Sequence, residues 1–350
     1  MFHSEAEQNS LESTRHSRFI SGYADTTLTI QYQNDLEIIG VGAAGQVYAV
    51  NEHTVLKACR IYEPPSPNAT ARVLWDYSSE TVFHYVILKD EREVLQLLAD
   101  HPHPNIIEVI DVDQPEGIYL RKYQQFSDLM PAPQMERILW YQEILRALSH
   151  LHELGITHSD IRIDNILFNF ERHALLSDFG ASCPFGYPNP SLLLLMNGVS
   201  DVVSDVTDRF AMASMIYELE TGGRPDISIN SSKELYFPTV QTGDVVLDAL
   251  IQNAWQGSFD STLAMLRHAE KLGYGRDIRQ PTMHSVSKTE LREQVLLWRT
   301  GRINKYGCVL FSLLTESQIQ ALAERYGWQP RRATIWKPAP TAPPHIDKDQ

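Results

Sequence analysis

The stretch from residue 158 to residue 180, HSDIRIDNILFNFERHALLSDFG, constrains the fold more than any other part of the chain. Its first eight residues carry charged and amide side chains, a short apolar run follows, and a second apolar run leads to Asp178. Two apolar runs joined by a turn predict a hairpin, which returns Asp178 to the neighbourhood of Asp160 and Asn165. Two carboxylates and a carboxamide on adjacent loops suit a site that positions a hydroxyl group and holds Mg²⁺ on phosphates. The chemistry that this set indicates is phosphoryl transfer.

The overall charge argues against two classes of partner. The formal net charge is −14 and the sequence pI is about 5.4, so no basic field is available to release the counterions of a nucleic acid. Anionic membrane surfaces are disfavoured for the same reason, and the longest apolar run, residues 192–196, is too short to cross a bilayer. Only three cysteines occur, without a CxxC pair, which favours a reducing compartment. We therefore predict a cytoplasmic or nuclear protein with no nucleic-acid or membrane partner.

A glycine cluster lies between two stretches of strand-forming residues. Gly40, Gly42 and Gly45 match GxGxxG, and Val47 follows in the second stretch. A dinucleotide-binding fold would enter a helix at this point, so the strand that follows argues against that fold. Glycines let a backbone approach phosphates closely, although an ordinary hairpin turn explains the same residues. Both interpretations stay open on the glycines alone.

Lys57 lies inside an apolar strand and needs a carboxylate partner if it is to act in a site. Residues 61–80 contain three prolines and many polar residues, and we expect a loop there. The helix expected after them, in ILKDEREVLQLLAD, carries Glu91 and Glu93. Glu91 shares a helix face with two leucines, which favours it over Glu93 as the partner of Lys57. A solvent-exposed lysine and a solvated glutamate remain the alternative.

The remaining patterns predict one sheet and a mainly helical second half. Strands in IIEVIDV and GIYLRKY complete a five-stranded antiparallel sheet. Apolar residues at helical spacing predict helices at 134–154, from Asp208 to the glycines at 222 and 223, at 244–255 and at 259–272. The fold class is therefore α+β, with a small antiparallel sheet lobe that carries one helix and a larger, mainly helical lobe.

The chain divides by composition into four parts. Residues 1–30 are polar and poor in large apolar groups, which predicts a disordered tail. Residues 31–272 form the domain, with lobes at 31–123 and 124–272. Residues 273–328 add helices, one with a start signal at Thr315, that pack on the domain or on a partner. Residues 329–350 contain PAPTAPP and predict a proline-rich disordered tail.

Taken together, these motifs resemble those of the eukaryotic protein kinase family over residues 31–272. In order stand the glycine loop GVGAAGQV, the strand VLK, the helix with Glu91, the loop HSDIRIDN, the triplet DFG and the helix expected from Asp208. The set also looks like that of short, divergent Ser/Thr kinase-domain proteins from fungi. The resemblance implies a two-lobed fold, ATP and Mg²⁺ as cofactors, and transfer of the γ-phosphoryl group to Ser or Thr hydroxyls of a protein substrate.

The resemblance also implies a role for each residue of the central set. Lys57, held by Glu91, would contact the α- and β-phosphates of ATP. Asn165 and Asp178 would hold Mg²⁺. Asp160 would orient the incoming hydroxyl and accept its proton.

Further site residues follow from the same resemblance. Arg162 stands where many Ser/Thr kinases carry lysine, and it would neutralise the transferred group with a different geometry. The other residues implied to bind ATP come from the glycine loop, the sheet and the strand after the catalytic loop: Gly40, Val41, Gly42, Gly45, Val47, Val55, Leu120, Tyr123 and Leu167.

Departures from the family pattern leave other functions open. Ser159 replaces the arginine that in the family pairs with a phosphate on the activation segment, which puts such regulation in doubt. Gly180 and Asp208 are only 28 positions apart with no APE triplet between them, and Val55 replaces a small alanine. The alternatives are a small-molecule kinase of the aminoglycoside or choline kinase type, or a pseudokinase scaffold that binds partners through its lobes and C-terminal helices.

Overall fold

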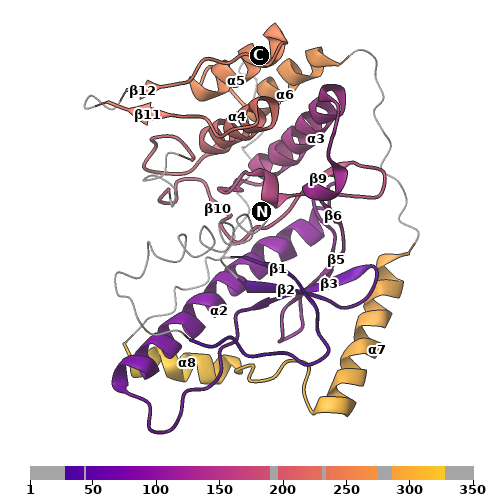
Figure 1. The fold of residues 1–350 in the computed structure, drawn as a ribbon, viewed down its shortest axis with the longest axis vertical. Helices are drawn as coiled ribbons and strands as arrows, with labels where there is room; N and C mark the ends of the chain where they lie inside the picture. Colours follow the sequence, from indigo (N-terminus) through magenta and orange to yellow (C-terminus); the bar gives the residue numbers. More distant parts are fainter. Residues whose placement is uncertain (1–27, 43–44, 190–195, 231–233, 274–285, 328–350) are drawn as a thin grey trace, which may run out of the picture.

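Strands form the core of the small lobe and helices form most of the large lobe in a computed structural model of the chain (Figure 1). The structure describes residues 28–42, 45–189, 196–230, 234–273 and 286–327. The predicted fold class is confirmed, because a five-stranded antiparallel sheet with a long helix is followed by a mainly helical lobe. The tails predicted at 1–30 and 329–350 lie outside the described residues, apart from residues 28–30.

The small-lobe sheet has the order β1-β2-β3-β5-β4, with every neighbouring pair antiparallel. Its strands are β1 (Ile38–Val41), β2 (Gly45–Ala49), β3 (Thr54–Cys59), β4 (Val109–Asp111) and β5 (Ile118–Arg121). Gly45 is the first residue of β2. A side chain does not fit at this position, because a Cβ would lie 2.0 Å from the carbonyl oxygen of Ala58 on β3. All residues of β3 and β5 are buried, so both faces of the sheet are covered.

Helix α7 (Lys288–Tyr306) covers the outer of these faces. The ring of Tyr119 meets the Trp298 ring edge-on, with centroids 6.1 Å apart, and its hydroxyl donates to buried Glu116 at 2.6 Å. Glu116 in turn accepts hydrogen bonds from Arg299 of α7. Lys57 is paired in register with the residue next to Tyr119, so it points to the opposite, inner face.

Helix α2 (Ala71–Asp100) shows that the loop predicted for residues 61–80 is wrong over residues 71–80. The three prolines end at residue 67, and Thr70 caps the helix by accepting a hydrogen bond from the Val73 amide. The first three turns are rich in β-branched, aromatic and serine residues, which are weak helix formers. Tertiary packing, rather than helix propensity, therefore stabilises this half of the helix.

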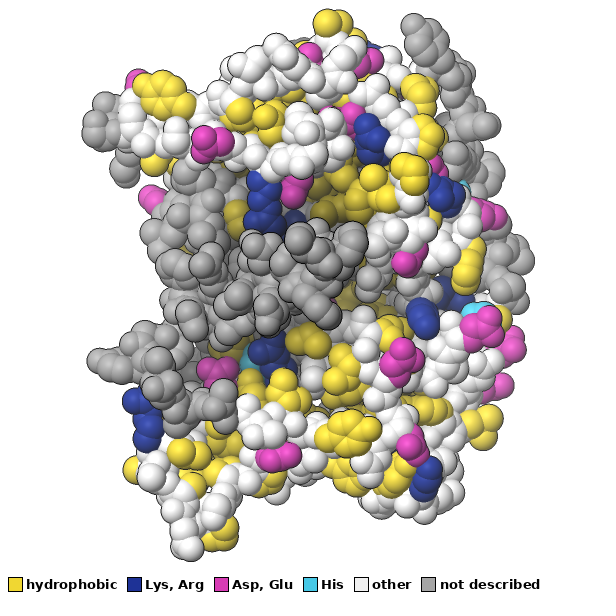
Figure 2. Space-filling view, viewed as in Figure 1, with side chains coloured by type: hydrophobic (Ala, Val, Ile, Leu, Met, Phe, Trp, Pro, Cys, Tyr) yellow, Lys and Arg dark blue, Asp and Glu magenta, His cyan; other side chains and the backbone are white. Residues whose placement is uncertain are grey.

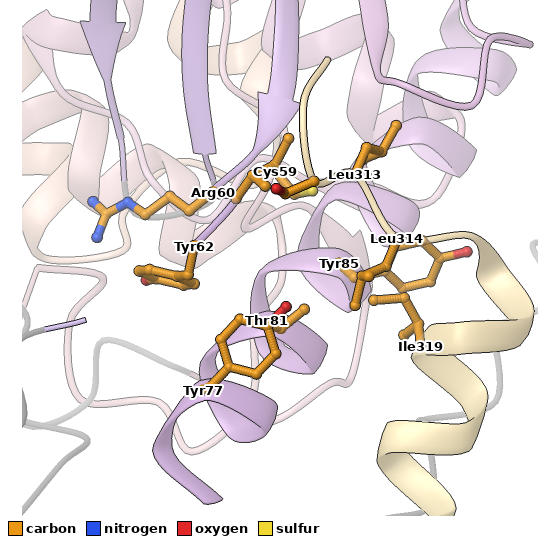
Figure 3. Close-up of a pocket in the computed structure, with 11 residues that line it drawn as sticks. Cys59, Arg60, Tyr62, Tyr77, Thr81, Tyr85, Leu313, Leu314 and Ile319 are labelled. Carbon is orange, nitrogen blue, oxygen red and sulfur yellow. The ribbon is translucent and has the colours of Figure 1, made fainter. Parts of the chain in front are cut away.

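That packing comes from helix α8 (Glu316–Arg325), which lies against the first half of α2 (Figure 1). Ile319 shares a small buried cluster with Val82, and Lys89 pairs with Glu316 at 2.7 Å. Figure 3 shows side chains of α2 facing the segment 312–319 across a cavity. The volume of this cavity is about 20 Å³. This volume is on the scale of one water molecule, so the junction is closely packed.

The first described residues and the segment between α7 and α8 also hold each other. Arg302 of α7 is buried, and it donates to the carbonyl of Asn34 at 2.9 Å and to that of Val309 at 2.6 Å. Gln33 exchanges two hydrogen bonds with the backbone of Phe311, at 3.2 Å and 2.7 Å. The two predicted C-terminal helices are thus built into the small lobe.

Four helices occupy the centre of the described part of the large lobe: α3 (Gln134–Glu153), α4 (Asp205–Thr221), α5 (Val245–Trp255) and α6 (Thr262–Ala269). The shorter elements are β6 (Gln124–Gln125), η2 (Phe126–Leu129), β7 (Ile156–Thr157), η3 (Ile163–Asn165), β8 (Ile166–Phe168), β9 (Ala174–Leu176), β10 (Cys183–Pro184), β11 (Ser228–Ile229), β12 (Leu235–Tyr236) and η5 (Glu270–Leu272). The predicted start of α4 at Asp208 is wrong by three residues, because Ser204 caps the helix. Asp208 consequently lies inside the helix.

The surface mixes side chains of all kinds. Figure 2 shows acidic, basic and apolar groups interspersed over one face, with Lys and Arg scattered among the described residues. Among the helices that the structure describes, none combines the length and the apolar character needed to cross a membrane.

Two stacked histidines connect the turn after α2 with α3. The rings of His103 and His150 have centroids 5.1 Å apart, and Nδ1 of His103 accepts a hydrogen bond from the Asn105 amide at 3.1 Å. Burial, aided by His150, lowers the pKa of His103 to about 4. As the pH falls below about 6.5, His103 takes up a proton in the unfolded chain but stays neutral in the folded protein. Proton uptake favours the unfolded state, so the contribution of neutral His103 to folding stability is full above pH 6.5 and declines toward pH 4.

We expect the variant His103→Asn to remove this pH dependence. Asparagine keeps an acceptor for the Asn105 amide but does not titrate. In urea unfolding between pH 7 and pH 5, the wild type should lose about 1–2 kcal/mol more stability than the variant. This expectation would be contradicted if the free energies of unfolding of the two proteins differed by the same amount at pH 7 and pH 5.

Candidate active site

A buried ion pair joins the sheet to helix α2. Nζ of Lys57 donates to Oε1 of Glu91 at 2.6 Å, and the Glu91 side chain is fully buried. The same oxygen accepts a hydrogen bond from the amide of Phe179 at 3.2 Å. Glu93, two residues further along the helix, is only partly buried. The structure therefore places Glu91, rather than Glu93, beside Lys57.

Lys57 also reaches Asp178, a contact that the sequence did not suggest. Nζ lies 2.9 Å from Oδ1 of Asp178. Burial works against the charge of Lys57, but the two carboxylates outweigh it and raise the pKa of the ammonium group. The charge of Lys57 holds the pKa of Asp178 below its usual range, whereas burial raises that of Glu91. A cation fixed between two carboxylates is well placed to bind phosphate oxygens.

The loop from His158 to Asn165 presents a second oriented carboxylate. Nδ2 of Asn165 donates to both the carbonyl and Oδ2 of Asp160, each at 2.8 Å. Arg162 pairs with Asp164 through Nε at 3.0 Å, so its guanidinium is directed to that neighbour. Asp160 is therefore held by an amide, in a geometry that leaves its carboxylate partly exposed.

Asp208 of α4 holds the loop from His158 to Asn165, a role that the sequence analysis missed. Its side chain is fully buried and accepts hydrogen bonds from the amides of His158 at 2.7 Å and Ser159 at 2.9 Å, and it lies 2.9 Å from Nε2 of His152. Ser159 adopts a left-handed backbone with φ of 65°, which needs such support in a residue other than glycine. The sequence offered one indication of this role, because Asp208 is a carboxylate on the apolar face of a predicted helix.

The residues predicted to hold Mg²⁺ fit that ion. Asp178 uses Oδ1 for Lys57 while its side chain remains 38% exposed, and Asn165 uses Nδ2 for Asp160, which leaves the Oδ1 atom as a ligand. Two oxygen ligands from protein, completed by phosphates and water, match the usual coordination of Mg²⁺. Among the described residues, no group of three or more His, Cys, Asp or Glu forms a metal site, so a protein-only cage is not built there.

The glycine loop lies over Asp178. A Cβ at Gly42 would be 3.9 Å from Oδ2 of Asp178. The Gly42 amide donates to the carbonyl of Gly45 at 2.9 Å, and its carbonyl accepts from Arg60 at 2.9 Å. Gly42 is thus held close to the carboxylate.

The inner face of the sheet collects several residues predicted to bind ATP. Val47 is opposite Lys57 and Gly40, and Val55 is opposite Leu120, so these side chains share one face. Both Val55 and Leu120 are buried.

Three further residues predicted to bind ATP are less clearly directed toward that face. Val41 is 58% exposed at the end of β1. The hydroxyl of Tyr123 accepts from the Glu108 amide at 3.2 Å, and Leu167 is opposite Leu175 in the β8–β9 hairpin. The part that these three residues take in binding stays a prediction.

Comparisons with known proteins agree with this arrangement. The family model described as "Protein kinase domain" matches residues 33–236, more than half of the chain. Serine/threonine-protein kinase ppk8 of Schizosaccharomyces pombe is 26% identical over 176 residues, 46% of this chain and 31% of that protein. Serine/threonine-protein kinase kin-29 of Caenorhabditis briggsae is 28% identical over 201 residues, 48% of this chain and 24% of that protein.

Protein kinase C of Drosophila melanogaster is 27% identical over 173 residues, 45% of this chain and 23% of that protein. The chain therefore spans less than a third of the length of these relatives, and the similarity concerns the kinase domain. With the family model covering residues 33–236, and with Lys57 joined to Glu91 and Asp178, the chain belongs to the protein kinase family.

Proposed function

We propose that this protein transfers the γ-phosphoryl group of ATP to Ser or Thr hydroxyls of protein substrates, with Mg²⁺. The observation that carries the proposal is the pairing of Lys57 with both Glu91 and Asp178, beneath the glycine loop. This pairing places a cation that can bind phosphate beside a carboxylate that can bind a metal ion. The names of two relatives, both serine/threonine-protein kinases, support the choice of hydroxyl.

Each residue has a defined part in the proposed transfer. Asp160, oriented by Asn165, takes the proton as the acceptor hydroxyl forms its bond to the γ-phosphorus and the bond to the β-phosphate oxygen breaks, which leaves ADP. Lys57 would neutralise phosphate charge, and Asp178 and Asn165 would hold the metal. When bound, Mg²⁺ would supply further neutralisation of the phosphate charge.

The first test is nucleotide binding, measured as thermal unfolding with ATP in the presence and absence of Mg²⁺. At a ligand concentration of a hundred times the dissociation constant, stability should rise by about 2.7 kcal/mol. Asp178→Asn should lose the metal-dependent part of this rise, because an amide replaces the charged ligand. The exposed residue Asp100, at the end of α2, provides the control variant Asp100→Asn.

The second test is transfer of labelled phosphate to a mixture of proteins and to small alcohols and amines. Labelled Ser or Thr on proteins supports the proposal. Label found only on metabolites would favour a small-molecule kinase, and binding without any transfer would favour a scaffold.

A further inference from the structure

The described parts of the activation segment, residues 181–189 and 196–203, are held by backbone pairing. Strand β10 in this segment pairs antiparallel with β7, directly before the catalytic loop. Farther along, the amide of Gly186 donates to the carbonyl of Val203 at 2.9 Å, and that of Val203 donates to Tyr187 at 2.8 Å. The described ends of the segment therefore fold back on each other.

Asn197 connects this segment to the catalytic loop. Its side chain is almost fully buried, and Nδ2 donates to the carbonyl of Ser159 at 2.9 Å. The amide of the same Ser159 is held by Asp208. Both backbone polar groups of Ser159 are thus fixed, one by the activation segment and the other by α4, and Asp160 is the next residue.

A phosphate would have little to bind at this position. The catalytic loop HSDIRIDN contains one arginine, Arg162, which pairs with Asp164, and no lysine. The side chain of Ser159 is buried and in contact with the hydroxyl of Thr157 at 2.6 Å. A phosphoryl group stabilises a segment chiefly through charge-assisted hydrogen bonds to basic side chains.

We propose that Asn197 is a positioning residue that fixes the catalytic loop from the activation segment without phosphorylation. The neutral amide performs the bridging for which a phosphate and an arginine would otherwise be needed. The effect on Asp160 is indirect, through the backbone of Ser159. This inference rests on the proposed function for its kinetic consequence, but its structural consequence can be measured separately.

The structural test is amide hydrogen exchange on protein produced in bacteria, treated with phosphatase and shown by mass to carry no phosphate. Peptides that cover residues 158–165 should be protected in the wild type. Asn197→Ala should speed their exchange at least tenfold. Asn51→Ala is the matched control, because Asn51 donates to Gln294 in the small lobe and its change should leave the catalytic loop protected. Asn197→Asp keeps the side-chain volume but places an oxygen against the Ser159 carbonyl, so it also removes the hydrogen bond. This variant is used for the measurement if Asn197→Ala does not fold.

The kinetic test compares kcat with KM for ATP. Misplacement of Asp160 should lower kcat about tenfold or more, while KM for ATP stays within twofold because Lys57, Glu91 and Asp178 are untouched. General loosening of the protein would change both constants. Phosphatase treatment should leave the wild-type kcat unchanged.

Different results separate the two proposals. A wild type that transfers no phosphate but keeps a protected loop, with protection lost in Asn197→Ala, would count against the proposed function and support the role of Asn197. Equal exchange in the wild type and Asn197→Ala would overturn that role. So would a wild-type loop that becomes protected only after phosphorylation, an outcome that can be read even if neither Asn197 variant folds.

Discussion

Replacement of Asp160 by Asn is expected to lower kcat for phosphoryl transfer by about 10²–10⁴-fold. The change removes one proton acceptor and alters the shape of the side chain very little. Asn165, which donates to Asp160 at 2.8 Å, still finds an oxygen acceptor on the new amide. In the proposed site, Lys57 and Asp178 bind the nucleotide and its metal ion, so the shift in thermal unfolding with ATP and Mg²⁺ should remain.

Steady-state kinetics on the variant, with Asp100→Asn beside it, provides the measurement. Asp100 is exposed at the end of α2, so the same chemical change there should leave kcat within about twofold, the usual range for a neutral surface substitution. An Asp160→Asn enzyme with nearly normal kcat would show that the hydroxyl loses its proton to another group. The assignment of Asp160 would then have to be abandoned.

Replacement of Asp208 by Ala is expected to cost about 3–5 kcal/mol of folding free energy. The carboxylate is fully buried, and its removal leaves the amides of His158 and Ser159 and the ring of His152 without their acceptor. Each buried donor that loses its partner costs about 1–3 kcal/mol. This loss is large against the 5–15 kcal/mol that stabilises a typical domain.

Urea unfolding of Asp208→Ala and Asp100→Ala gives a direct comparison. Asp100 is exposed at the end of α2, so its loss should change stability by no more than about 0.5 kcal/mol. Similar losses for the two variants would mean that the hydrogen bonds of Asp208 add little to stability. The catalytic loop would then depend on other contacts for its left-handed turn.

Residues within one short stretch were the easiest to predict. A single hairpin separates Asp178 from Asp160 and Asn165. Two apolar runs joined by a turn were therefore enough to predict that these residues lie close together. The pairing of Lys57 with Glu91 followed from helix periodicity, because only one of two candidate glutamates shared a face with buried leucines. The five-stranded sheet followed in the same way from local pattern.

Features that depend on distant packing could not be predicted. The first ten residues of α2 have weak helix propensity, and the turns that follow them pack on α8, more than 200 positions away in the chain. Asp208 and Asn197 act through backbone groups of the catalytic loop, and backbone donors and acceptors have no sequence signature. The periodicity of α7 revealed an amphipathic helix but could not reveal that its partner was the outer face of the sheet.

The order of the elements in the small lobe has a consequence for biosynthesis. Strands β1 to β5 leave the ribosome early, but α7, which covers their outer face, follows only after residue 287, and Arg302 must reach back to Asn34. Until then a sheet with an uncovered apolar face is exposed on the nascent chain, a state prone to aggregation. The large lobe can meanwhile complete its helices. The lobe that is synthesised first is therefore the lobe that finishes folding last.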